Sequence, residues 1–389
     1  MRLWKRAKGA LKDKYSIWVA KLSPSGPFRN PDLETVIIKA TSHDEQGMDY
    51  KSVQRVFQWL RTSPLYLKPL LYSLSMRMEK TRSWVVALKG LMLIHGVFCF
   101  DLPNVQNLGR LPFDFSHFID GHMNPQKAWV HNAFVRSYFA YVDKKSAFVR
   151  LEATRQNKRR NNKEIEETVM EELQNLERLQ NLIDLLLQIK PRDPSMNVVL
   201  VFEAMDCVMD EVLEVYGKFC KVFRRVLLRV FDVGGKEEAM VALDVVKKTE
   251  LQGSKLTLYF EFCRELGALN VSEYPQIMRI DNKEVDELRR IMMEGNDNDN
   301  DHNNEDVELE DNNNAKQLDL EVLKTVITDQ WEVFDDDDDD DLLVNVKESV
   351  SKGTSSPMVT TNNPFLDSLA LIPYAPVYNN LVLPDLIIF

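Results

Sequence analysis

The sequence predicts an all-α solenoid followed by a disordered acidic tail. Residues 1 to about 290 form one helical apolar pattern after another, and alternating patterns bounded by hairpin turns are absent from them. Several of the predicted helices are too long for a compact four-helix bundle, and no fixed-period repeat is visible, which favours an irregular superhelical stack. The composition changes abruptly near Gly295. We therefore divide the chain into a helical part, 1–290, and a tail, 291–389.

The first helix is predicted over the first 22 residues. Its apolar side chains recur at spacings of three and four, which is typical of one stripe of an amphipathic helix: Trp4, Ala7, Leu11, Tyr15, Trp18 and Leu22. Pro24, Gly26 and Pro27 then end the pattern. Further helical patterns cover 31–42, 50–62, 64–79, 82–98, 127–153, 163–189, 197–231, 236–250 and 253–268, with Gly253 separating the last two.

The sequence indicates neither a signal peptide nor a membrane-spanning helix. The first residues, MRLWKRAKGALKDK, contain no apolar core run. The longest apolar stretch, Ser83–Phe100, is interrupted by Lys89 and His95, so we expect a buried core helix there. The four cysteines form neither a CxxC pair nor a zinc spacing, and we expect buried free thiols in a reducing cytosol.

Catalytic patterns are equally absent. Gly234-Gly235-Lys236 lacks the earlier glycine and the following Ser or Thr of a phosphate-binding loop. The spacings of His117, His122 and His131 do not place them on one helix face. We therefore expect a protein that is not an enzyme and has no cofactor and no metal site.

The charge is divided between the two ends of the chain. Residues 1–160 carry 27 Lys and Arg against 12 Asp and Glu, an excess of 15 positive charges. Residues 291–389 carry 4 against 23, an excess of 19 negative charges. Such asymmetry indicates a basic head for an anionic partner and an acidic tail for other partners.

The first 21 residues are the most basic segment, with Asp13 as their single acidic residue. Their cations are Arg2, Lys5, Arg6, Lys8, Lys12, Lys14 and Lys21. An anionic membrane surface attracts such residues by about 1 kcal/mol each. Nucleic acid feels the same field, but the head lacks a nucleic-acid-binding module and does not interleave its aromatic residues with its cations, so we expect no nucleic-acid partner. In the alternative interpretation the cations are solvated helix faces, with Trp4 and Trp18 packed inward.

Several segments, in order, resemble the ANTH domains of clathrin assembly proteins, including the plant branch, over about residues 1–280. They are Lys39-Ala-Thr-Ser-His43-Asp44, Trp84-Val-Val-Ala-Leu-Lys-Gly-Leu-Met-Leu-Ile-His95, Tyr138-Phe-Ala-Tyr-Val-Asp143, Leu179-Gln-Asn-Leu-Ile-Asp-Leu-Leu-Leu-Gln-Ile-Lys-Pro191 and Leu251-Gln-Gly-Ser-Lys-Leu-Thr-Leu-Tyr-Phe260. The resemblance implies an α-solenoid that binds phosphatidylinositol 4,5-bisphosphate on a cluster of lysines and a histidine. It also implies a link between the membrane, clathrin and cargo, with vesicle SNAREs as a cargo class.

The lipid motif of that family is a lysine, nine residues, a second lysine, one residue, Lys or Arg, and His or Tyr. Lys39 and Lys51 match its first and third positions, whereas Asp49 and Ser52 occupy the second and fourth. Two of the four ligands are therefore lost, and one carries the opposite charge. We expect Lys39, His43 and Lys51 to form a weakened site of reduced selectivity.

The first helix is expected to supply most of the remaining lipid affinity. Lys5, Arg6 and Lys8 can attract anionic headgroups by a less stereospecific route than a headgroup pocket does.

Short apolar islands in the tail resemble docking motifs for coat proteins. Asn363-Pro364-Phe365 resembles the ligand of EH domains, and Asp341-Leu342-Leu343 resembles a clathrin contact. Trp331 and Phe334, beside seven consecutive aspartates, resemble motifs for adaptor appendage domains. The aspartates could alternatively serve only solubility and chain extension.

Together these observations predict an endocytic clathrin adaptor. Its head would bind a phosphoinositide membrane, and its tail would recruit the clathrin heavy chain, adaptor appendages and EH-domain proteins. We expect it in the cytoplasm, peripherally on clathrin-coated pits and vesicles or at the Golgi. The alternative is a helical scaffold off the membrane whose basic face binds an acidic protein or RNA.

Overall fold

The computed structural model describes residues 2–24, 26, 28–99, 103–161, 167–267 and 275–294. Within these ranges the chain is all-α, as predicted, apart from an isolated bridge between Gly26 and Arg29. The α-helices are α1 (Arg2–Leu22), α2 (Pro31–Ala40), α3 (Tyr50–Thr62), α4 (Leu67–Lys80), α5 (Trp84–Phe98), α6 (Pro103–Gln106), α7 (Pro125–Asn161), α8 (Val169–Leu186), α9 (Val199–Val233), α10 (Lys236–Glu265) and α11 (Asn282–Glu294). Two 3₁₀ turns, η1 (Pro64–Tyr66) and η2 (Pro194–Met196), precede α4 and α9.

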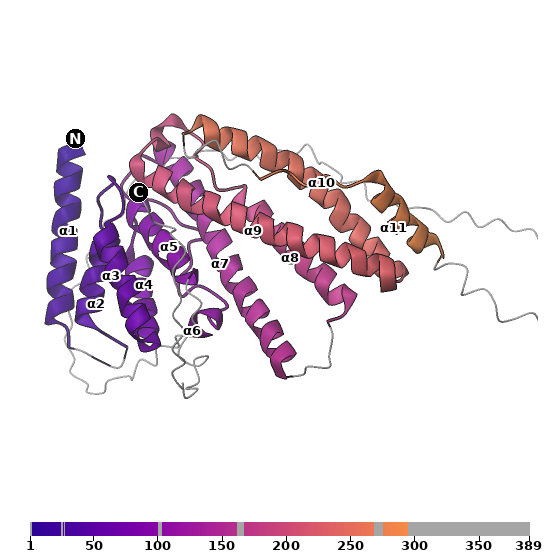
Figure 1. Ribbon diagram of the computed structural model, residues 1–389. Helices are drawn as coiled ribbons and strands as arrows, with labels where there is room; N and C mark the ends of the chain where they lie inside the picture. The colour runs from indigo at the N-terminus through magenta and orange to yellow at the C-terminus, as the bar shows by residue number, and fades with distance from the viewer. Residues whose placement is uncertain are drawn as a thin grey trace, which may run out of the picture. The chain divides into compact units, whose positions relative to one another are not determined.

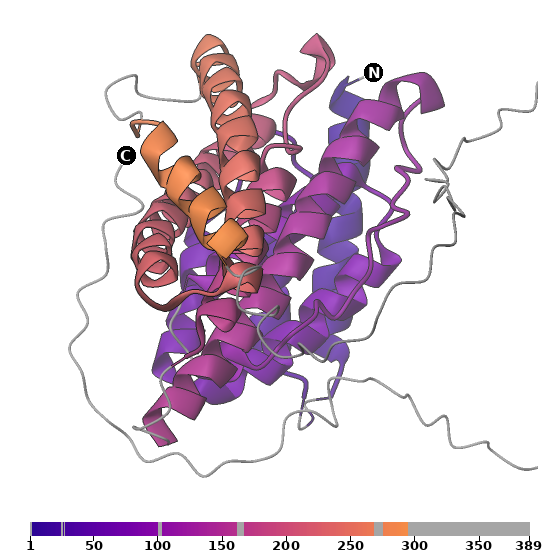
Figure 2. The same ribbon diagram turned by 90° about the vertical axis from the view of Figure 1, so that its right-hand side faces the viewer.

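The helices stack in chain order, which confirms the predicted solenoid. Helix α1 packs on α2, α2 on α3 and α4, α5 on α7, and α7 on α8 (Figure 1). Helices α8, α9 and α10 then pack side by side, and α11 lies along α10 (Figure 2). Helices α2 to α11 contribute buried apolar side chains to one shared core, because an amphipathic helix is stabilised when its apolar face packs against a neighbour.

Helix α5 forms the centre of the first half of the stack. Between Trp84 and Phe98 every residue except Gly96 is buried. Its N-terminus is capped from a distant loop, where Asp120 Oδ2 accepts the Trp84 N–H at 2.8 Å. The burial of α5 confirms the predicted core helix. In the described ranges, no helix is long and apolar enough to cross a membrane.

A buried charge cluster joins α5, α7 and α9. Glu211 of α9 accepts hydrogen bonds from His95 Nε2 at 3.0 Å, from Tyr141 and from Lys145. Burial opposes ionisation of Glu211, but the hydrogen bond from His95 and the charge of Lys145 outweigh it and lower its pKa. The cluster therefore holds an ionised carboxylate inside the core.

The helices differ from the prediction most clearly at Gly253, at the end of α7 and at α11. Helix α10 continues through Gly253, and a Cβ there would lie 2.9 Å from Ile277 Cγ2, so this glycine permits close packing instead of ending a helix. Helix α7 extends to Asn161, where its basic last turn is exposed. Helix α11 was not predicted, because its segment is highly charged.

The cysteines also differ from expectation. All four are free, but only Cys263 is buried, whereas Cys99 is exposed and Cys207 and Cys220 are half-buried. The prediction of buried thiols is therefore confirmed for Cys263 and wrong for Cys99, while Cys207 and Cys220 are only partly buried.

Candidate lipid-binding surface

The loop Thr41–Asp49, between α2 and α3, carries the predicted histidine and is fixed first by α1 and α4. The Asp13 carboxylate of α1 accepts two hydrogen bonds from His43, one from the ring nitrogen Nδ1 and one from the backbone N–H, both at 2.8 Å. Arg77 of α4 donates to Asp13 at 2.9 Å, to Thr41 Oγ1 at 2.6 Å and to the Thr41 carbonyl at 2.7 Å. Burial opposes ionisation of Asp13, but the hydrogen bonds from His43 and the hydrogen bond from the Arg77 guanidinium outweigh it and lower the pKa of Asp13. Asp13 is therefore the ionised anchor that ties α1 to this loop.

The same loop also forms hydrogen bonds with α5 and α9. Glu203 of α9 accepts the Met48 N–H at 2.8 Å. Gly47 has φ +138°, and a Cβ there would meet Glu203 Oε1 at 2.7 Å, so only glycine fits this turn. From α5, Lys89 is fully buried and donates to Ser42 Oγ at 3.1 Å. Burial lowers the pKa of Lys89 to about 8, although nearby acidic groups oppose that shift.

The predicted phosphoinositide ligands lie at both ends of this loop. Lys39 is exposed in the last turn of α2, and Lys51 is exposed in the first turn of α3. The His43 side chain is 20% exposed and turns toward Asp13. The structure thus brings two exposed lysines to one pinned loop, whereas the histidine already has a partner inside the protein.

Asp49 and Ser52, the two residues that depart from the family motif, bond to each other. Asp49 is the N-cap of α3, and its carboxylate accepts the Ser52 N–H at 3.2 Å and the Ser52 hydroxyl at 2.7 Å. The negative charge between Lys39 and Lys51 is therefore a structural part of the helix start.

Helix α1 turns its apolar stripe outward. Leu11, Tyr15, Trp18 and Leu22 are 67%, 66%, 59% and 65% exposed. The interpretation that packs Trp18 inward is wrong, and the side chain of Trp4 lies outside the described residues. Exposed apolar side chains arranged along one helix face are a mark of an interaction surface.

The face of α1 that packs on the domain is made by small residues and Asp13. Gly9 and Ala20 are buried, and a Cβ on Gly9 would lie 2.7 Å from His43 Cβ. On a helix of 3.6 residues per turn, Gly9, Asp13 and Ala20 lie opposite the apolar stripe. The sequence pattern alone misleads here, because the buried positions among the described side chains of α1 are Gly9, Asp13 and Ala20, and none of them is a large apolar residue.

Lysines flank the exposed stripe on both sides. At 3.6 residues per turn, Lys8 and Lys12 fall along one edge and Lys14 and Lys21 along the other, and all four are exposed. Lys12 also donates to His122 Nε2 at 2.9 Å, which adds a second tie between α1 and the domain. The side chains of Lys5 and Arg6 lie outside the described residues.

Two residues of this surface escape the sequence reasoning. Arg77 and Lys89 hold the loop Thr41–Asp49 but sit on α4 and α5, far from it in sequence. Lys89 does leave a signal, since a lysine inside a helix that is otherwise apolar needs a polar partner. The predicted tail residues lie outside the described part of the chain: Trp331, Phe334, Asp341, Leu342, Leu343, Asn363, Pro364 and Phe365.

Comparison with known proteins identifies the family. The model of the ANTH domain matches residues 32–293. The Arabidopsis thaliana protein named "Putative clathrin assembly protein At1g25240" is 43% identical, with both chains covered in full. The same name with At1g68110 belongs to a second Arabidopsis thaliana protein, 40% identical over both full lengths. A third, with At1g14686, is 40% identical over 76% of this chain and 84% of its own. This chain therefore belongs to the ANTH domain family, as its helical architecture and the motifs around Lys39 and Trp84 predict.

Proposed function

We propose that the protein is a clathrin adaptor that attaches peripherally to anionic, phosphoinositide-containing membranes and recruits coat proteins through its tail. The observation that carries the membrane part is the surface of α1, where an exposed apolar stripe is edged by lysines. A helix of this kind lies in the membrane interface, with its apolar side chains between the headgroups and its cations at the phosphates.

Two physical contributions add up on this helix. Each lysine near an anionic surface contributes about 1 kcal/mol, and this part weakens with salt. Burial of Leu11, Trp18 and Leu22 among acyl chains adds a salt-independent part of up to about 1.5–3 kcal/mol for each side chain that becomes fully buried. Asp13 and Arg77 fix the loop Thr41–Asp49 to the opposite side of α1, so insertion of the stripe would hold this loop about one helix diameter, about 10 Å, from the membrane.

The loop is proposed as a weak phosphoinositide site. Lys39 and Lys51 offer two exposed cations, but Asp49 stands between their motif positions with its negative charge. His43 is held by Asp13 and has little exposed surface for a headgroup. We therefore infer that the protein selects anionic membranes strongly but distinguishes phosphoinositide species less sharply than the full motif would.

The recruiting part of the proposal rests on relatives and on sequence motifs. The relatives at 40–43% identity carry the name "Putative clathrin assembly protein". The clathrin heavy chain is the proposed partner of Asp341-Leu342-Leu343, and adaptor appendage domains that of Trp331 and Phe334. EH domains would bind Asn363-Pro364-Phe365, and several weak contacts would act together through avidity. Vesicle SNAREs are a proposed cargo, and coated pits and vesicles, or the Golgi, are the proposed locations.

Vesicle flotation of the full chain tests the membrane part. The chain should float with vesicles that contain phosphatidylserine and phosphatidylinositol 4,5-bisphosphate at physiological salt, and stay in the dense fraction with neutral vesicles. Deletion of residues 1–21 should remove most of the binding. A chain that ignores acidic vesicles would support a helical scaffold whose basic face binds an acidic protein or RNA.

Pull-down of purified partner domains tests the recruiting part. Clathrin terminal domain should lose binding to the full chain after Leu342→Ala and Leu343→Ala, and EH domains after Phe365→Ala. If neither the clathrin terminal domain nor the EH domains bind the unsubstituted chain, the tail is only a spacer.

A further inference from the structure

A second basic surface lies where the end of α7 meets α8 and α9. Two adjoining hollows of about 200 and 170 Å³ open there, and Arg155 and Arg159 line both. Their cationic residues are Arg155, Lys158, Arg159, Arg178, Lys218 and Arg225. Their acidic residues are Glu152, Glu167 and Glu171, so six positive charges face three negative ones. We call these six cations the α7–α9 basic cluster.

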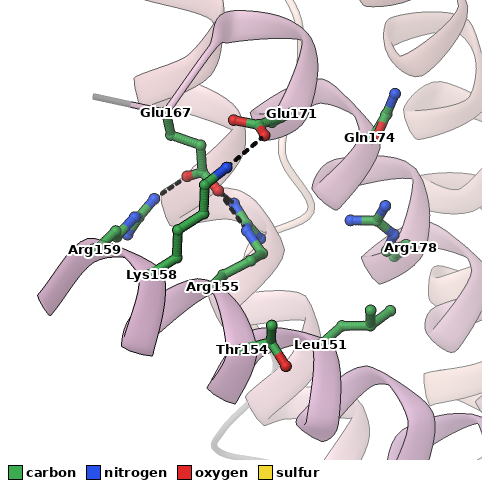
Figure 3. Close-up of a pocket in the computed structure, with 9 residues that line it drawn as sticks. All are labelled: Leu151, Thr154, Arg155, Lys158, Arg159, Glu167, Glu171, Gln174 and Arg178. Atoms are coloured by element: carbon green, nitrogen blue, oxygen red, sulfur yellow. Dashed lines mark hydrogen bonds and ion pairs between the residues drawn. The ribbon is translucent and has the colours of Figure 1, made fainter. Parts of the chain in front are cut away.

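The acidic residues do not neutralise the cluster. Arg155 and Arg159 both converge on Glu167 (Figure 3), and Glu152 pairs with Arg155 at 2.6 Å and with Lys218 at 3.2 Å, so two carboxylates serve three cations. Lys158 lies 3.6 Å from Glu171, while its side chain stays 60% exposed. Beneath the hollows, Glu172 pairs with Arg225 and also with Arg229, which leaves the excess of three unchanged.

Arg178 gives the hollow an uncompensated cation. Its guanidinium points into the space between α7 and α8 in Figure 3, and no ion pair joins it to any residue that the structure describes. Leu151, 47% exposed, adds an apolar side chain to the same hollow. A groove with exposed arginines and one apolar patch fits an extended acidic segment that also carries an apolar residue.

We propose that the aspartate run Asp335–Asp341 of the chain's own tail docks on the α7–α9 basic cluster. The run supplies seven consecutive carboxylates, directly preceded by Phe334, and thus complements both the charge and the apolar patch. The described helices end at Glu294, and the 41 residues from there to Asp335 can span about 130 Å when extended, so chain length does not restrict the contact. A continuous run fits better than the interrupted acidic stretch at 297–311, because neighbouring carboxylates can meet the closely spaced cations together.

Docking would add regulation to the proposed function, and in that respect it rests on it. Phe334 and Trp331 would be held against the helical domain, so a coat protein that binds them would first have to displace the run. The contact itself needs neither lipid nor clathrin, and it can be measured without them.

Zero-length carbodiimide cross-linking of the full chain tests the contact, because it joins carboxylates to lysine amines that touch. We expect peptides containing Asp335–Asp341 to be linked to Lys158 and Lys218 at low salt. The yield should fall at least about fivefold at about 0.5 M NaCl, where the Debye length is only a few ångströms. A mixture of ¹⁵N-labelled and unlabelled protein identifies the links as intramolecular.

Matched variants separate the cluster from general charge attraction. Arg155→Gln, Arg159→Gln and Arg178→Gln together should lower the yield at least about fivefold while leaving both lysines in place. Arg55→Gln, Lys80→Gln and Lys127→Gln remove as many exposed cations elsewhere and should leave the yield unchanged.

Because Arg155 and Arg159 also pair with Glu167, a second variant leaves the domain untouched and replaces all seven aspartates by Asn. In that variant, amide exchange in 150–161 should become faster.

Several results would overturn the proposal. These are the absence of links to Lys158 and Lys218, links from 297–311 in place of the aspartate run, links mainly to the lysines of α1, or links only between different molecules. Unchanged amide exchange in the aspartate-to-asparagine variant would also overturn it. Failure here would leave vesicle flotation untouched, so the two proposals fail separately.

Discussion

Asp13 and His43 are thirty residues apart and share two hydrogen bonds of 2.8 Å, one from the imidazole and one from the backbone N–H. Asp13 is the single acidic residue of α1. It lies on the face of the helix opposite the exposed apolar stripe, so its contact with His43 fixes which side of α1 meets solvent.

Replacement of Asp13 by Asn should loosen α1. An amide cannot satisfy both His43 and Arg77 as a carboxylate does, and hydrogen bonds to a charged group contribute about 1.5–3 kcal/mol. We expect faster amide exchange over residues 8–22 and a lower free energy of unfolding. Lys14→Gln, an exposed change on the same helix, is the matched control. Equal protection of α1 in Asp13→Asn and the unsubstituted chain would show that other contacts orient the helix.

The buried Glu211 predicts a dependence of stability on pH. Its folded pKa lies below the ordinary 4.5, because His95 and Lys145 favour the carboxylate more than burial disfavours it. Below about pH 4.5, Glu211 therefore binds a proton in the unfolded state but stays ionised in the folded state. The free energy of unfolding consequently falls as the pH falls. Above pH 4.5 this contribution is fully present.

Glu211→Gln should remove this contribution. The variant leaves Lys145 and His95 without their buried carboxylate, and loss of one partner from such a pair costs about 3–5 kcal/mol. Chemical denaturation followed by circular dichroism at several pH values measures both effects. The difference between the two chains should shrink as the pH is lowered from 6 toward about 3. A constant difference would mean that Glu211 is not the group responsible.

Asp49→Asn tests the weakened lipid site without disturbing the helix start. Asparagine is as good an N-cap as aspartate, so α3 should keep its stability. Removal of one negative charge should strengthen binding to vesicles with phosphatidylinositol 4,5-bisphosphate by about 1 kcal/mol, or about fivefold. Sedimentation across phosphoinositide species measures this, and a strong preference of the unsubstituted chain for the 4,5-bisphosphate would contradict reduced selectivity.

Much of the fold could be predicted from the sequence, because helix periodicity and proline positions are local signals. The prediction of a break at Gly253 failed for a reason that lies 24 residues away, at Ile277. The segment of α11 gave little apolar signal, since its partner surface on α10 makes it a helix in this fold. Tertiary packing decided both cases.

The candidate site was predictable only in part. Lys39, His43 and Lys51 could be named from a motif, but the motif does not show that His43 is held by Asp13. The apolar stripe of α1 was visible in the sequence, whereas its direction was not, because the packed face uses Gly9 and Ala20 in place of large apolar residues. Which face of an amphipathic helix is buried depends on the surface that it meets.

The central claim is that the exposed stripe of α1 carries membrane attachment, and flotation of a stripe variant tests it most directly. Leu11→Ser, Trp18→Ser and Leu22→Ser change exposed side chains and should leave stability nearly unchanged. Met240→Ser, Leu251→Ser and Leu258→Ser on α10, which replace three comparably exposed apolar residues, form the control. The account predicts that the α1 variant loses binding to acidic vesicles by at least about tenfold, while the α10 variant floats like the unsubstituted chain. Undiminished flotation of the α1 variant would contradict it.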